Sequence, residues 1–93
     1  MVGTFGGALE ARQIDASGGR LTADVTGEIE KEDGVLVIRR IHVHMRLAAP
    51  ADVSAVVERV HEFYAMRCPL YRTLHNAIAL SSSYELMSAA SLA

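Results

Sequence analysis

Hydrophobic positions near the start of the chain recur at roughly helical spacing. From Val2 to Ile14, apolar side chains and alanines form one stripe, and Glu10 and Arg12 fall outside it. This pattern predicts an amphipathic helix over residues 2–14. Glycine costs about 1 kcal/mol relative to alanine in a helix interior, so the three glycines in this segment indicate a closely packed face. We therefore expect the helix to be the remainder of a longer element that packs against another part of a fold.

Two segments with a period of two residues follow a glycine-rich loop at residues 15–19. The first runs from Leu21 to Glu30 and the second from Val35 to Leu47, and Asp33-Gly34 between them suits a tight hairpin turn. We expect an antiparallel hairpin in which acids of the first strand pair with bases of the second. The expected apolar face of the second strand comprises Val37, Ile41, Val43, Met45 and Leu47. Its expected polar face comprises Arg40, His42, His44 and Arg46.

A second helix is predicted from Asp52 to Met66, after Pro50, which suits a first helical turn. Pro69 ends it, and a short turn over residues 70–76 leads to a closing strand from Ile78 to Leu86. The tail from Met87 is expected to fray. The helix positions interpreted as core are Val53, Val56, Val57, Val60, Phe63 and Tyr64. Those interpreted as its solvated side are Glu58, Arg59 and Glu62.

The order helix, hairpin, helix, strand predicts an α+β fold with a sheet packed on helices, in a single domain over residues 1–93. The chain is 51% hydrophobic and 22% charged, which is typical of a globular domain. A chain of this length buries only about 60 to 65% of its unfolded surface, so its core is small. We therefore expect a homo-oligomer, in the simplest case a dimer.

Composition also narrows the partners and the compartment. The net charge is −2 with acids and bases interspersed, which argues against nucleic acid as a partner. No apolar stretch approaches the roughly 18 residues of a membrane span, and no targeting segment is recognisable, so no membrane association is expected. One cysteine excludes a disulfide within the chain. These features favour a cytoplasmic protein.

Four histidines are the only candidates for a metal site. His42 and His44 lie two apart on one strand face, and His61 or His75 would add a third imidazole only if the fold brought it close. Arg40 on the same face would repel a cation. A solvated face paired with acids is therefore the favoured interpretation, and neither a metal nor another cofactor is expected.

Cys68 is the one candidate for reactive chemistry, and two interpretations remain open. At the junction between the second helix and Pro69, backbone N–H groups together with Arg67 and Arg72 could stabilise a thiolate. Alternatively, Cys68 is a small buried hydrophobe without reactivity, the favoured interpretation for a lone cysteine.

Several segments together resemble the OsmC/Ohr family of hydroperoxide-resistance proteins. Arg67–Leu74 resembles the family's Cys-Pro segment, which follows a valine-rich helix. Gly27–Glu30, the Asp33-Gly34 turn and Arg39–Val43 resemble its central hairpin, and Ala8–Arg12 resembles the end of its core helix. The resemblance covers nearly the whole chain but only the C-terminal part of the family's pattern.

The resemblance implies a thiol peroxidase that reduces organic hydroperoxides. Such proteins use a reactive cysteine on the core helix, a second cysteine in the Cys-Pro segment, and a nearby arginine and glutamate. Only the second cysteine has a counterpart here, Cys68, as a resolving-type thiol. We therefore expect a relative with little or no peroxidase activity alone, whose partners are an organic hydroperoxide or a small thiol. The alternative is a non-enzymatic module for homo-oligomerisation or small-ligand binding.

Overall fold

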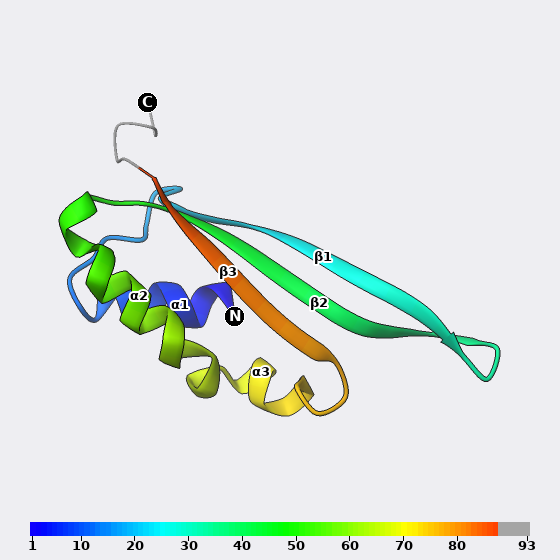
Figure 1. Cartoon of the computed structure of the whole chain (residues 1–93). Coiled ribbons are helices and arrows are strands. Elements are labelled where there is room, and N and C mark those ends of the chain that lie inside the picture. Colours follow the sequence, from blue (N-terminus) through cyan, green and yellow to red (C-terminus); the bar gives the residue numbers. More distant parts are fainter. Residues whose placement is uncertain (88–93) are drawn as a thin grey trace.

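A computed structural model describes residues 1–87 and has an α+β architecture with a three-stranded sheet (Figure 1). In chain order the elements are α1 (Val2–Glu10), β1 (Leu21–Glu32), β2 (Val35–Ala48), a 3-10 turn η1 (Ala51–Val53), α2 (Ser54–Phe63), a 3-10 turn η2 (Tyr64–Arg67), α3 (Pro69–Leu74) and β3 (Ala79–Met87). The predicted fold class and order of elements are confirmed. Within residues 1–87, no helix has both the length and the apolar character needed to cross a membrane.

The sheet has the order β1-β2-β3, with β1 antiparallel to β2 and β2 parallel to β3. A parallel pair cannot be joined by a tight turn, so the chain crosses from the end of β2 to the start of β3 through α2 and α3. Figure 1 shows both helices on this connection. The crossover places Cys68, between η2 and α3, on the way back to the sheet.

The hairpin turn forms as predicted, because Asp33 and Gly34 both have positive φ, 52° and 80°. This backbone shape matches the twist of the flanking strands, and glycine adopts it without strain. Acids and bases also pair across the outer face, where Arg40 donates to Glu28 at 2.6 Å and to Glu30 at 2.8 Å. The predicted antiparallel hairpin and its charge pairing are confirmed.

A β-bulge corrects the predicted faces of the second strand. Glu28 pairs with Arg40 and Ile29 with Ile38, which leaves Arg39 as an extra residue on β2. The extra residue reverses the alternation on the turn side of the bulge. Val37 therefore pairs with Glu30 on the charged face, and was wrongly assigned to the apolar face. A prediction from strict alternation of residues along a strand cannot anticipate such an inserted residue.

The core lies between the two longer helices and the inner face of the sheet. Helix α1 contributes Phe5 and Leu9, and these side chains are fully buried. The other buried members of this core are Ile14, Val43, Met45, Leu47, Ala49, Val57, Val60 and Tyr64. The hydrophobic stripe of each helix therefore faces the sheet, where its side chains are buried in this cluster.

Three details of the predicted helices are wrong. Helix α1 ends at Glu10, and a turn follows in which Gln13 has φ 62°, so the helix does not reach Ile14. Gly6 packs closely, with Leu21 3.2 Å from the site of a Cβ, but Gly3 and Gly7 face open space. On the second helix, the predicted core residues Val56 and Phe63 are exposed, because the sheet covers a narrower stripe than the pattern suggested.

The molecule is elongated, with principal extents of 50 × 26 × 20 Å. Figure 1 shows the distal half of the β1–β2 hairpin reaching past the helices. We call residues 25–38 the hairpin arm. Its exposed apolar side chains are Val25, Ile29, Val35, Leu36 and Ile38. Of the tail predicted to fray, Met87 is the last residue of β3, and the rest lies outside the described residues.

Truncation of the buried α2 valines should destabilise the fold. Val57 and Val60 fill the core, so Val57→Ala and Val60→Ala should each lower the free energy of unfolding by about 1 to 3 kcal/mol. Glu58→Ala and Arg59→Ala on the exposed side of α2 are the matched controls, with expected changes within about 0.5 kcal/mol. Urea unfolding measures all four. Equal losses for valine and control variants would contradict this orientation of α2.

Candidate functional site

Cys68 occupies the junction between η2 and α3 and is only 2% exposed. Its backbone is extended, with φ −88° and ψ 117°, as expected for a residue before proline. The backbone N–H of Cys68 donates to Ala65 at 3.0 Å, and its carbonyl accepts from Arg72 at 3.0 Å. The backbone is thus tied on both sides, and the thiol points into the protein.

The surroundings of Cys68 favour the thiolate. Burial raises the pKa of the Cys68 thiol, but hydrogen bonds from the Tyr71 backbone N–H, the Thr4 hydroxyl and the Met1 amino group lower it by more. The net result is a pKa below the ordinary value for cysteine. Backbone donation was expected, whereas the predicted contribution of Arg67 and Arg72 is not among these interactions. The side chain of Cys68 is also buried, as the interpretation of an unreactive cysteine predicted.

The first turn of α1 therefore meets the Cys-Pro junction. The Thr4 hydroxyl and the amino group of Met1, at the start of the same helix, both help to lower the pKa of the Cys68 thiol. Tyr64 also interacts electrostatically with Cys68. Burial is the main cause that raises the pKa of the Tyr64 hydroxyl, and the negative charge of the Cys68 thiolate raises this pKa further. Position 4 is thus a place from which a second side chain could reach the Cys68 sulfur.

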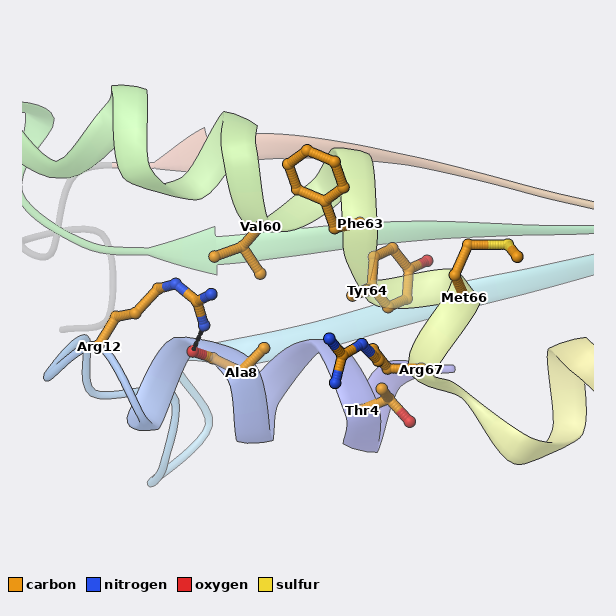
Figure 2. A pocket seen from close by; sticks show the side chains of 8 residues that line it. All are labelled: Thr4, Ala8, Arg12, Val60, Phe63, Tyr64, Met66 and Arg67. Carbon is orange, nitrogen blue, oxygen red and sulfur yellow. Dashed lines mark hydrogen bonds between the residues drawn. The ribbon is translucent and has the colours of Figure 1, made fainter.

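A groove of about 490 Å³ runs between α1 and the α2–η2 segment (Figure 2). We call it the interhelical groove. Its lining residues are Thr4, Ala8, Arg12, Val60, Phe63, Tyr64, Met66 and Arg67. Thr4 belongs both to this groove and to the surroundings of Cys68, so the groove lies next to the thiol. No acidic residue lines it.

The outer face of the sheet carries a separate row of polar side chains. His42 contacts Ser81 at 2.7 Å and Ser83 at 2.8 Å, and His44 contacts Ser83 at 2.7 Å. The partners of these imidazoles are mainly serines of β3, and Glu85 is farther from His44, at 3.7 Å. The predicted pairing with acids thus holds in part, and the serines were missed because the register of β3 was unknown.

The four histidines do not converge. His61 lies on the inner face of the sheet beside Ser82, opposite to His42 and His44, and His75 stacks on Tyr71 at the end of α3. Among residues 1–87, no three histidine, cysteine or acidic side chains are grouped as metal ligands. The third imidazole that a metal site needs is therefore not brought to the histidine pair.

His61 belongs instead to an aromatic cluster over the sheet. Its ring centroid lies 4.8 Å from that of Tyr84 and 6.0 Å from that of Phe5. Its Nε2 lies 3.1 Å from Ser82 Oγ, which accepts a hydrogen bond from the Tyr64 hydroxyl at 2.6 Å. Since Ser82 has one proton to donate, a neutral His61 that accepts it satisfies all three groups. Burial accordingly lowers the pKa of His61.

Sequence reasoning found Cys68 but not the residues around its sulfur. Thr4 is far from Cys68 in the chain, and only the packing of α1 on η2 brings the two together. Tyr71 contributes a backbone N–H, which no side-chain pattern reports. The four-residue spacing of Thr4 and Ala8 on α1, continued by Arg12 in the turn after the helix, is a signal that could have indicated the groove.

Comparisons with known proteins agree with this fold. The family model described as OsmC-like protein matches residues 2–83. The structure is similar to an OsmC-like protein from Mycoplasma pneumoniae, with a TM-score of 0.72 and 22% identity over 91% of this chain. It is also similar to the organic hydroperoxide resistance protein OhrB of Bacillus subtilis, with a TM-score of 0.61 and 17% identity over 90% of this chain. A comparison with curated protein sequences finds no match.

The chain belongs to the OsmC-like protein family, because the family model covers most of its length. The resemblance seen in the sequence is thereby confirmed. The two solved structures are below 25% identity and support the fold. The chain spans 61% of the Mycoplasma pneumoniae protein and 62% of OhrB.

His61 should make the stability of the fold depend on pH. Its folded-state pKa is lowered, so the unfolded chain binds a proton more readily. The free energy of unfolding should therefore be highest above about pH 6.5 and fall as the pH drops toward the folded-state pKa. His61→Gln should reduce this loss, whereas His75→Gln, at an exposed position, should leave it unchanged. Urea unfolding at pH 7.5 and 5.0 measures the difference, and an unchanged loss in His61→Gln would refute the assignment.

Proposed function

We propose that this chain is a cytoplasmic OsmC/Ohr-like protein with little peroxidase activity alone, in which Cys68 serves as a resolving-type thiol. The observation that carries the proposal is the Cys68 junction: a buried thiol whose thiolate is stabilised by Tyr71 and Thr4. Family membership supports a link to hydroperoxide chemistry, and OhrB of Bacillus subtilis is named for organic hydroperoxide resistance. Its partners would be an organic hydroperoxide or a small thiol.

The chemistry of the family explains why one thiol is insufficient. A thiolate attacks a peroxide oxygen, the O–O bond breaks, and the products are a sulfenic acid and an alcohol. A second thiol then displaces the sulfenic oxygen as water and forms a disulfide, which a dithiol reductant reduces with two electrons. Cys68 is the single cysteine of the chain, so the disulfide needs a thiol from another molecule.

Access also limits Cys68 as the attacking group. Its side chain is 2% exposed, whereas a peroxide must reach the sulfur in line with the O–O bond. A disulfide partner on the adjacent turn of α1 would need no such approach through solvent. The position of Cys68 therefore suits the second step of the cycle better than the first.

Peroxide consumption tests this role. With tert-butyl hydroperoxide and a dithiol reductant, the native chain should show slight turnover, and Cys68→Ser should differ little from it. The gain-of-function arm is Thr4→Cys, because the Thr4 side chain interacts with the Cys68 sulfur. It should form a disulfide with Cys68 after oxidation and raise turnover at least about tenfold.

Gly3→Cys is the matched control for the added thiol, since a Cβ at Gly3 meets nothing within 4 Å. It should form no disulfide with Cys68. Fast, saturable turnover of the native chain that Cys68→Ser abolishes would refute the resolving role, because Cys68 would then be the attacking thiol itself. Equal disulfide formation by the two cysteine variants would refute the proposed placement of the Thr4 side chain beside Cys68.

The second candidate function is a non-enzymatic module for homo-oligomerisation or small-ligand binding. The observation that favours oligomerisation is the uncovered hairpin arm, where Ile29 and Leu36 are 62% and 66% exposed. These residues continue the same inner face that the helices cover nearer the core. Exposed apolar surface of this kind is typical of protein–protein interfaces, and a dimer is its simplest closed assembly.

Light scattering at micromolar concentration should therefore find a homodimer. Ile29→Glu together with Ile38→Glu should shift the protein toward monomer, because these paired side chains would place charge on the apolar side of the arm. Glu30→Gln on the charged side is the control and should leave the dimer intact. A well-folded monomer of the native chain would exclude this candidate.

A further inference from the structure

We infer that the interhelical groove binds a small amphipathic carboxylate, with its head group held by Arg12 and Arg67 and its hydrocarbon tail along α2 and η2. The inference rests on the small-ligand form of the second proposed function and names its ligand class. It requires no reaction at Cys68.

The two arginines converge from opposite ends of the groove. Figure 2 shows the guanidinium of Arg12 and that of Arg67 both directed toward the stretch of α1 that carries Ala8. Arg12 donates one hydrogen bond, from Nη1 to the Ala8 carbonyl at 2.9 Å, and this contact holds the guanidinium over the groove. Arg67 begins from the far side, at the end of η2. The small Ala8 side chain between them leaves room for a head group.

Arg12 and Arg67 form no ion pair with the described residues. Within residues 1–87, the ion pairs of Arg20, Arg39, Arg40 and Arg46 account for the arginine salt bridges, and neither Arg12 nor Arg67 takes part in one. No acidic residue lines the groove. Arginine prefers planar, two-oxygen anions, which it binds through parallel N–H donors. A carboxylate therefore complements this pair of side chains.

The rest of the lining suits a hydrocarbon tail. Phe63 and Met66 are 62% and 56% exposed although both are large and apolar, and Val60 forms part of the floor. The volume of about 490 Å³ falls within the usual range of about 300 to 1,000 Å³ for small-molecule sites. An apolar tail that covers Phe63 and Met66 would remove their surface from water. Charge and apolar surface thus lie side by side, as an amphipathic anion requires.

Isothermal titration calorimetry of the full chain with decanoate, below its micelle concentration, tests the inference. One saturable site per chain is expected. Decanol, which has the same tail without the charge, should bind at least about tenfold more weakly, because it lacks the charge-assisted hydrogen bonds. Arg12→Gln and Arg67→Gln should each weaken decanoate binding about tenfold or more. Arg59→Gln, on the exposed side of α2 and outside the groove, should leave it unchanged.

Each alternative result contradicts the inference in a distinct way. Equal binding of decanol and decanoate would show an apolar surface without carboxylate recognition. Equal weakening in all three arginine variants would show attraction to general positive charge. Absence of binding would show that the groove is closed to ligands, for example by a second copy of the chain. None of these results would alter the peroxide consumption of native, Cys68→Ser and Thr4→Cys proteins, so a failure here is separable from a failure of the thiol role.

Discussion

The packing of α1 against α2 and the inner face of β2 is the interaction on which the rest of the molecule depends. The fully buried side chains of Phe5 and Leu9 on α1 belong to the same core cluster as Val57 of α2 and Met45 of β2. The same packing of α1 places Thr4 beside the Cys68 sulfur. It also places Ala8 and Arg12 along the interhelical groove, opposite Arg67 of η2. Helix α1 and the turn that follows it thus supply part of the core, one side of the thiol environment and one wall of the interhelical groove.

The helices cover only part of the sheet, and this mismatch shapes the surface chemistry. Strands β1 and β2 are 12 and 14 residues long, whereas α1 and α2 are 9 and 10 residues long. Because a strand rises about 3.3 Å per residue and a helix 1.5 Å, the hairpin extends well beyond any helix beside it. Its inner face keeps its apolar character past that point. The chain spans about three fifths of the length of the two similar structures.

The Cys68 junction combines a favourable electrostatic environment with poor access. Donors around the sulfur lower the thiol pKa, while burial removes it from solvent. A thiol that must attack a soluble peroxide needs a lowered pKa and access from solvent. A thiol that completes a disulfide with a neighbouring helix needs the lowered pKa and proximity to its partner. The site and the groove share Thr4, so a ligand in the groove would lie against the helix turn that contacts the sulfur.

The chain pattern by itself determined the elements and their order, because helical and strand periodicities, the Asp33-Gly34 turn and Pro69 act through local geometry. It also indicated the buried positions Val57 and Val60 and the thiol at Cys68. Tertiary structure alone decided the parallel pairing of β3 with β2, the bulge at Arg39 that turned Val37 outward, and the exposure of Val56 and Phe63. It also decided that Thr4 meets Cys68 and that Arg12 and Arg67 share a groove. The physical reason is that these features depend on which surfaces of distant segments meet in the folded chain. The spacing of residues along the sequence does not say how far apart two distant segments lie in space.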